Sequence, residues 1–206
     1  MATVAQVLAL AAHMPPRFVA LITVAAFSGL RWGELVALRR CDADLEAGTV
    51  RVPRKLAALK GGLEFGPPKS AAGLRVVALP AVARRALGAH LDKFTARAPA
   101  VLIFTGDKDT PLRTGNFRRA VKWSTALADA GMPEGFHFPD LRHTGNNIAA
   151  ASGASTRELM HRMGHASMRA ALIYQHATSD RDREIADTMD KRIAKGAKPR
   201  KAKKRS

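Results

Sequence analysis

The sequence predicts a mainly α-helical domain with a small antiparallel β-sheet inserted among the helices, an α+β fold. Two observations support this class: apolar residues recur at helical spacing along most of the chain, and two short stretches of β-type alternation, at residues 48–53 and 73–80, flank a glycine-rich connection. A length of 206 residues and a hydrophobic content of 47% suit one well-buried core. We therefore expect one domain over residues 1–194, with the β insertion at about 48–80 and a basic tail at 195–206.

The N-terminal part predicts a series of helices broken by turns. Residues 3–14 have apolar side chains at helical spacing, with Thr3 placed as the N-cap and two prolines after the last turn. A second helix is expected at residues 17–27. The following SGLRWGELVALRR turns at its first glycine and resumes as a helix to about residue 38, which places Arg31 at a turn–helix junction.

Beyond the expected sheet the pattern returns to helices. One helix is expected from residue 80 to about residue 97, and the following VLIFTG fits either a short buried strand or an extended linker. Thr114 is placed to cap the next helix. The remaining helices are expected at residues 114–130, 139–152, 155–163, 167–175 and 179–195, the last being charged and amphipathic.

Several classes of protein fit the composition poorly. The longest apolar run, FVALITVAAF, is about half the length that a bilayer crossing requires, so no membrane association is expected. The N-terminal MATVAQVLALAAHMPPR lacks the basic start and the cleavage site of a secretory signal. The single cysteine, Cys41, cannot form an internal disulfide, which fits a reducing compartment. We expect a cytoplasmic protein.

The strongest signal in the composition is positive charge. Lys and Arg number 34 against 17 Asp and Glu, which gives a formal net charge of +17 and a pI near 11.2. The tail KGAKPRKAKKRS is expected to be disordered; it holds seven of these cations and leaves the folded body at +10. This balance predicts a polyanionic partner bound through its phosphate backbone. Charge alone does not separate a DNA-binding protein from a ribosomal or RNA-binding one.

Three other kinds of reactive site are disfavoured by residue spacing. His161 and His165 are four apart, but Gly164 is expected to end the helix between them, and no carboxylate or cysteine completes a metal set. A Ser-His-Asp triad is left open, although no nucleophile-elbow pattern is present. The glycines at residues 61–66 lack the lysine and hydroxyl spacing of a phosphate-binding loop. We therefore expect neither a metal nor a nucleotide cofactor.

Four stretches in a fixed order point to one chemistry. They are SGLRWGEL with Arg31, PPKSAAGLRVV with Lys69, DLRHTGNN with Arg142, and MGHAS…IYQH with His165 and Tyr174. In this order and spacing the chain resembles the tyrosine recombinase family, the phage-type integrases, over nearly its whole length. The resemblance implies a helical catalytic domain that cuts and rejoins double-stranded DNA through a covalent 3′-phosphotyrosyl intermediate, without metal or nucleotide cofactor.

The two arginines suit the charge that this chemistry creates. Attack on a phosphodiester builds negative charge on the non-bridging oxygens, and guanidinium groups hold such a phosphate with paired, permanently charged donors. The resemblance assigns this role to Arg31 and Arg142. A structural explanation competes for each of them: a surface salt bridge from Arg31 to Glu34, and a helix-surface cation at Arg142.

The resemblance also assigns roles to Lys69, His165 and Tyr174. Lys69 would protonate the departing 5′-oxygen from a mobile hairpin loop, but a solvated loop lysine is the strongest competing interpretation because lysines are plentiful here. His165 would hydrogen-bond the scissile phosphate, with helix capping as its alternative. Tyr174, the only tyrosine in the chain, would be the nucleophile, and its alternative is packing within a helix.

One position departs from the family pattern. The second arginine usually belongs to a His-x-x-Arg motif, but Pro139 stands three residues before Arg142. Proline suits the first turn of a helix, yet it removes the imidazole that the motif supplies. His137 is the favoured substitute, because His143 is rotated about 100° from Arg142 on a helix; His176 is a further auxiliary candidate. Loss of one acid-base group costs about 10²- to 10⁴-fold in rate, so we expect a weakened enzyme rather than an inactive one.

The resemblance also implies how such a domain is used. Family members generally carry an upstream helical domain that closes around DNA; nothing before residue 17 is long enough to be one, so we expect a catalytic domain without it. The helix at 179–195 resembles an element passed to a neighbouring subunit, which predicts a cyclic homo-oligomer, a tetramer, on DNA. Two other functions are left open: a type IB topoisomerase, which paired-site recombination assays would distinguish, and a non-catalytic DNA-binding remnant or regulator.

Overall fold

The structure, a computed structural model, describes residues 1–106 and 109–164 and five residues further on: Arg183, Ala186, Asp187, Met189 and Asp190. The chain forms two compact units, Met1–Tyr174 and Gln175–Ser206. In the second unit the five described residues are helical and exposed, within the range where a helix was expected. The helix expected at 167–175 and the tail at 195–206 lie outside the described residues.

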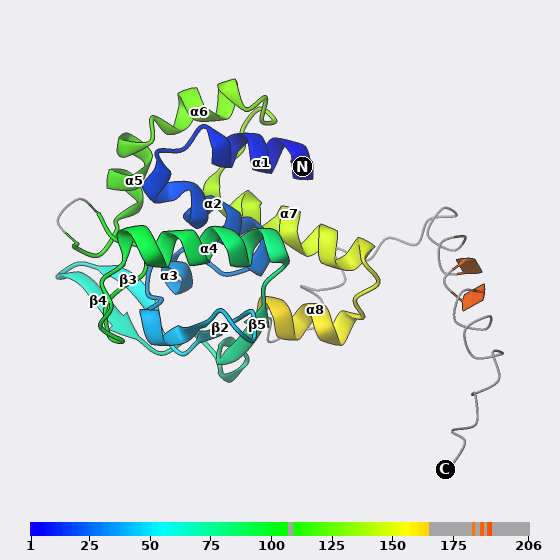
Figure 1. Cartoon of the computed structure of the whole chain (residues 1–206), viewed down its shortest axis with the longest axis horizontal. Coiled ribbons are helices and arrows are strands. Elements are labelled where there is room, and N and C mark those ends of the chain that lie inside the picture. Colours follow the sequence, from blue (N-terminus) through cyan, green and yellow to red (C-terminus); the bar gives the residue numbers. More distant parts are fainter. Residues whose placement is uncertain (107–108, 165–182, 184–185, 188, 191–206) are drawn as a thin grey trace, which may run out of the picture. The chain divides into compact units, whose positions relative to one another are not determined.

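The first unit is built mainly from helices. Its core is formed around α2, which packs against α1, α4 and α7 (Figure 1) and is apolar on nearly all sides, as a helix surrounded by other helices must be. The helices are α1 (Val4–Ala12), α2 (Pro16–Ser28), α3 (Trp32–Leu35), α4 (Ala81–Phe94), α5 (Thr114–Ala120), α6 (Trp123–Asp129), α7 (Phe138–Ala151) and α8 (Thr156–Met163), with short 3-10 turns η1 (Arg40–Asp42) and η2 (Ala71–Gly73). None of the described helices is long and apolar enough to cross a bilayer.

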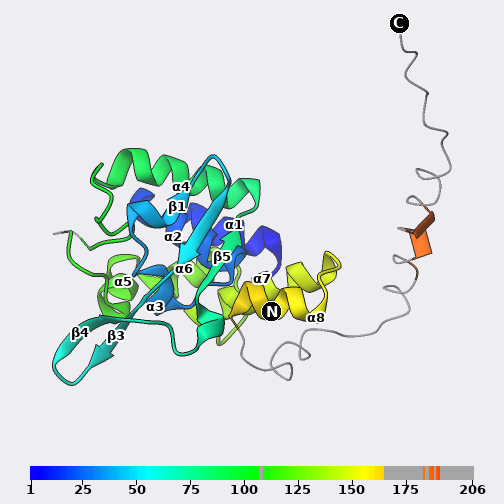
Figure 2. The ribbon, with the colours of Figure 1, turned by 90° about the horizontal axis from the view of Figure 1, so that it is seen from below.

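The small sheet expected near the middle of the chain is present and antiparallel. The strands are β1 (Ala43–Asp44), β2 (Thr49–Val52), β3 (Lys55–Leu59), β4 (Gly62–Gly66) and β5 (Arg75–Ala78). Strand β2 pairs with β5 with Val50 opposite Val77, and β1 extends this sheet on the other edge of β2. The glycine-rich connection holds a second hairpin, β3–β4, which the sequence did not predict and which extends away from the helices (Figure 2).

The helix expected at 114–130 is divided into α5 and α6. The break lies at Lys122, whose backbone is left-handed at φ 47°. In one continuous helix Phe117 and Trp123, six residues apart, would be rotated by about 240° and could not face the same core. With the break both rings are buried, with centroids 5.7 Å apart. The packing of two large aromatic side chains has therefore overridden the local helical pattern.

Other differences from the expected elements are small. Helix α3 ends at Leu35, and α4 ends at Phe94. The VLIFTG stretch is an extended linker with isolated bridges, Arg39 to Leu102 and Thr105 to Pro111, rather than a strand. Thr3 caps α1 as expected: its hydroxyl accepts a hydrogen bond from the Gln6 N–H at 3.1 Å.

An aromatic cluster joins the starts of α3 and α7. The rings of Trp32 and Phe138 meet edge to face, with centroids 4.8 Å apart, and Phe117 contacts both of them. Edge-to-face pairs of this kind are favoured by the ring quadrupoles and fix the relative position of the elements that carry them. The cluster therefore holds the first residues of α3 and α7 side by side, next to Arg31 and Pro139.

Candidate active site

Arg31 stands at the N-cap of α3, where the sequence placed it. The chain leaves α2 through Gly29, whose φ of 71° is left-handed and favours glycine. Glu34 then holds Arg31 twice, accepting from its backbone N–H at 2.9 Å and from its guanidinium at 3.1 Å. The salt bridge considered for Arg31 is therefore present. It leaves the Arg31 side chain 48% exposed, so part of the guanidinium faces solvent.

Glu34 is the centre of a buried network that the sequence did not reveal. Arg75, fully buried on β5, donates to both carboxylate oxygens of Glu34, at 2.9 and 3.3 Å. Its remaining donors reach the carbonyls of Arg162, at 3.0 Å, and Gly73, at 3.1 Å. One feature of the sequence could have indicated it. Arg75 occupies an inward position at the start of a strand of alternating burial, and a buried arginine requires a partner.

The charge of this network is fixed. Burial alone would raise the pKa of Glu34, but the hydrogen bonds and charge of Arg75, together with Arg31, outweigh it and hold that pKa below its ordinary value. Glu34 is therefore an anion balanced by two cations. The carboxylate that orients Arg31 is itself held by the buried Arg75.

Arg142 is buried rather than a helix-surface cation. It is 9% exposed, and its guanidinium donates to the carbonyls of Gly29 and Met163, the latter at 2.6 Å. It lies on α7, which approaches α2 so closely at Gly145 that an added Cβ would stand 1.8 Å from the Ala26 carbonyl oxygen. A glycine at that point allows α7 to present Arg142 to the end of α2.

The two arginines converge at the C-terminal end of α8. Arg31 makes long hydrogen bonds to the carbonyls of Met163, at 3.4 Å, and Gly164, at 3.5 Å, and Arg142 donates to the same Met163 carbonyl. Gly164 ends α8 in the left-handed conformation. Both guanidiniums therefore lie beside the point where the chain passes into His165.

A cavity of about 310 Å³ opens beside these arginines. No carboxylate lines it among the residues that the structure describes, so the fixed charge facing it is positive. Phosphate is the kind of ligand that paired guanidiniums on an apolar wall would hold. The lining residues are Ala25, Leu30, Arg31, Trp32, Phe138, Pro139, Arg142 and His143.

The remaining predicted residues differ in their relation to this cavity. Lys69 is exposed in the segment between β4 and η2, after the β3–β4 hairpin rather than at its tip. His137 is the N-cap of α7; its side chain is 67% exposed, lies 3.9 Å from the Asp140 carboxylate, and does not line the cavity. His143, which was judged the poorer substitute for the missing imidazole, does line it.

Three predicted residues, His165, Tyr174 and His176, lie outside the described residues. Within the part of the chain that is described, no group of three or more His, Cys, Asp or Glu residues could hold a metal ion.

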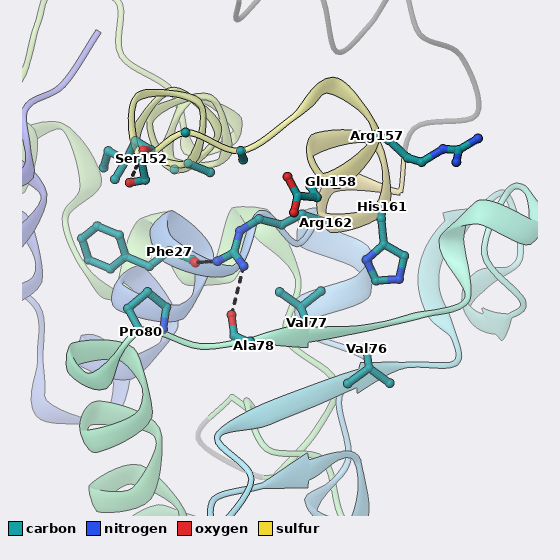
Figure 3. A pocket seen from close by; sticks show the side chains of 15 residues that line it. Phe27, Val76, Val77, Ala78, Pro80, Ser152, Arg157, Glu158, His161 and Arg162 are labelled. Carbon is teal, nitrogen blue, oxygen red and sulfur yellow. Dashed lines mark hydrogen bonds between the residues drawn. The ribbon is translucent and has the colours of Figure 1, made fainter. Parts of the chain in front are cut away.

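A larger pocket of about 870 Å³ lies between α7, α8 and β5 (Figure 3). Figure 3 shows Arg162 extending from α8 across it, where its guanidinium donates to the carbonyls of Phe27 and Ala78, the latter at 3.1 Å. Of the predicted site residues that the structure describes, none lines this pocket. Among the described residues, the Arg31–Arg142 cavity therefore combines fixed positive charge with the predicted motifs.

Comparison with known proteins identifies relatives over most of the chain. The model of the phage integrase family matches residues 2–181. A putative prophage phiRv2 integrase of Mycobacterium tuberculosis (strain CDC 1551 / Oshkosh) is 37% identical over 178 residues, which are 86% of this chain and 47% of that protein. The integrase of Mycobacterium phage FRAT1 is 34% identical over 172 residues, 82% of this chain and 51% of that protein. The chain thus spans about half the length of these relatives.

Solved structures share the fold at lower sequence identity. The Tn1549 transposon integrase in complex with circular intermediate DNA superposes with a TM-score of 0.74 at 23% identity, covering 91% of this chain and 66% of that one. XerA recombinase gives a TM-score of 0.68 at 22% identity, covering 91% and 62%. These likenesses confirm the expected fold class, and the family match over residues 2–181 settles the membership: the chain belongs to the phage integrase family.

Proposed function

We propose that the chain is the catalytic domain of a site-specific DNA recombinase, which cleaves and rejoins DNA through a 3′-phosphotyrosyl intermediate at Tyr174. The observation that supports this most directly is the convergence of Arg31 and Arg142 on one cavity and on the Met163 carbonyl. Residues 111 positions apart in the sequence form a single positively charged recess beside the start of the His165 segment.

Within this proposal the arginines hold the scissile phosphate. In the transition state negative charge grows on the non-bridging oxygens, and groups that are already charged and already oriented stabilise it without rearranging. Arg142 is oriented by two backbone carbonyls and Arg31 by the buried Glu34. His165 adds a further hydrogen bond to the phosphate.

The bond changes need no external energy source. The Tyr174 oxygen attacks phosphorus and the 5′-oxygen leaves with a proton from Lys69, whose exposed loop suits delivery to bound DNA. One phosphodiester replaces another, so the exchange is roughly energy-neutral and reverses readily. A general acid-base group is missing at Pro139, so we expect cleavage to be slow.

DNA is the substrate that the charge favours. The chain carries a formal net charge of +17, and solved structures that share its fold include complexes with DNA, among them those of the Tn1549 transposon integrase and lambda integrase. We expect binding through the phosphate backbone, weakening steeply with salt, and assembly of a cyclic homo-oligomer, a tetramer, on the recombination site.

The proposal is tested with a suicide DNA substrate, nicked so that the short fragment with the released 5′-hydroxyl diffuses away and religation stops. The chain should form a denaturation-resistant protein–DNA adduct, and Tyr174→Phe should abolish it while leaving DNA binding intact. An unchanged adduct in Tyr174→Phe would assign the attack to another residue, and no adduct from the unsubstituted chain would refute the proposal.

One observation favours a second function, that of a non-catalytic DNA-binding regulator. Pro139 lines the cavity itself, so proline stands within the site at the position where the family motif has its histidine. A chain of this kind would bind DNA with the same salt dependence and form no adduct even at long incubation.

A further inference from the structure

We propose that His143 is the proton-accepting catalytic residue of this site, an inference that rests on the proposed function. Of the described residues that line the Arg31–Arg142 cavity, it is the one whose side chain can both accept and donate a proton. The guanidiniums of Arg31 and Arg142 and the indole of Trp32 only donate. The other lining side chains are apolar.

The geometry of α7 places His143 on the same face as Pro139. Residues four apart on a helix are separated by about 6 Å along the axis and by roughly 40° around it. Phe138 and Arg142 form one such pair and Pro139 and His143 the other, and all four line the cavity. His143 therefore lies one turn after Pro139 on the same side of α7. Although His143 is rotated away from Arg142, it still lines the cavity.

His137, the alternative histidine, is held elsewhere. It caps the start of α7, where its backbone N–H donates to the Asp140 carboxylate at 2.7 Å. Its ring is largely exposed and close to that same carboxylate. The charged groups that face His143 across the cavity are Arg31, from the N-cap of α3, and Arg142, from α7 itself; α2 contributes only apolar side chains to that wall.

The proton balance of cleavage follows from this assignment. The Tyr174 hydroxyl gives its proton to a neutral nitrogen of His143 as the oxygen–phosphorus bond forms. The phosphorus–5′-oxygen bond breaks, and the 5′-oxygen takes a proton from Lys69. Religation runs the same transfers in reverse, so His143 returns the proton to the tyrosine.

The test compares His143→Ala with its matched control His137→Ala, the one within α7 and the other at its N-cap, both at exposed positions where folding should be little affected. Single-turnover adduct formation on the suicide substrate should fall by about 10²- to 10⁴-fold in His143→Ala and stay unchanged in His137→Ala. His143→Gln, which keeps a polar side chain but takes up no proton, should be as slow as His143→Ala.

Two further measurements separate proton transfer from a structural role. Imidazole added to the solution should partly restore cleavage by His143→Ala. Pro139→His, combined with His143→Ala in one double variant, should also restore cleavage, because either change supplies an imidazole to the same cavity. A rate equal to that of His137→Ala, or a loss that neither treatment restores, would overturn the assignment. Either result leaves the recombinase proposal standing, which fails only if the unsubstituted chain forms no adduct.

Discussion

The arginines and the lysine proposed for the site are held in opposite ways. Arg142 is buried and tied to backbone carbonyls, and Arg31 is tied to Glu34, which the buried Arg75 also holds, whereas Lys69 lies exposed in the segment after the β3–β4 hairpin. Groups that stabilise developing charge work best when they are already in place, because no reorganisation is needed at the moment of reaction. A proton donor must instead reach an oxygen that moves away as the bond breaks, and an exposed loop permits this.

The difference also separates stability from activity. Removing a buried charged partner leaves the other charge uncompensated in the protein interior, which is costly for folding. Removing an exposed lysine leaves the fold untouched and affects only the step that it serves. Substitutions in the two regions should therefore produce different kinds of damage.

Lys69→Ala should give the largest effect, on rate alone. We expect adduct formation to slow by about 10²- to 10⁴-fold, the usual contribution of one acid-base group, with no change in the free energy of unfolding. A substrate whose departing 5′-oxygen is replaced by sulfur should remove most of this defect, because a thiolate leaves without a proton. Equal defects on the oxygen and sulfur substrates would show that Lys69 is not the proton donor.

Glu34→Ala should chiefly damage stability. It leaves Arg75 buried without its anion, and breaking a buried ion pair in this way costs about 3–5 kcal/mol. Urea denaturation measures the loss. The matched control is Asp109→Asn, which removes the charge of the Arg17–Asp109 pair at a side chain that is 83% exposed and keeps a residue that tolerates the left-handed backbone there. Exposed pairs contribute about 0–1 kcal/mol. Similar losses in both variants would contradict the view that burial makes the Glu34 network important.

The free energy of unfolding should depend on pH through His90, whose buried imidazole has no oppositely charged partner among the described residues. Its Nε2 donates to the Ile103 carbonyl at 2.8 Å, and its buried Nδ1 has no hydrogen-bond partner among the described residues. Burial, assisted by the charge of Arg17, lowers the pKa of His90 below its ordinary value of 6.5. The unfolded chain therefore binds the proton more readily, so this contribution to stability is complete above pH 6.5 and declines as the pH falls below it.

The measurement is the free energy of unfolding between pH 7.5 and 5. One titrating group gives a slope of at most about 1.4 kcal/mol per pH unit. His90→Gln, which keeps a donor for Ile103 but does not titrate in this range, should reduce the slope. An identical slope in both proteins would assign the pH dependence to other groups.

What the sequence could predict was local or carried by a motif. Helices α1 and α8 follow from spacing and capping residues within a few positions, and strands β2 and β5 follow from the alternation within each stretch. The division between α5 and α6 could not be predicted, because it depends on Phe117 and Trp123 both meeting the ring of Phe138, which is distant in the sequence. The Glu34–Arg75 pair joins residues 41 apart, and no local pattern specifies such a partner.

The site was predicted unevenly for the same reason. Arg31, Lys69 and Arg142 were proposed because their neighbours in the sequence form recognisable motifs. The preference for His137 over His143 came from the rotation of His143 away from Arg142, although Pro139 and His143 on α7 both line the cavity. Which side of a helix faces a site depends on what packs opposite it, here the start of α3, and that information is not local.

The smallest effect is expected at the start of α8. The Ser155 hydroxyl accepts a hydrogen bond from the Glu158 N–H at 3.3 Å, and the Glu158 carboxylate accepts one from the Ser155 N–H at 2.7 Å, forming a capping box. Ser155→Ala should lower the free energy of unfolding by about 1 kcal/mol, whereas Ser155→Thr, which keeps the hydroxyl, should lower it less. Adduct formation should be unaffected in both, because the other end of α8 is fixed by Arg142 at Met163. A slower cleavage rate in Ser155→Ala would show that the arginines do not hold that end by themselves.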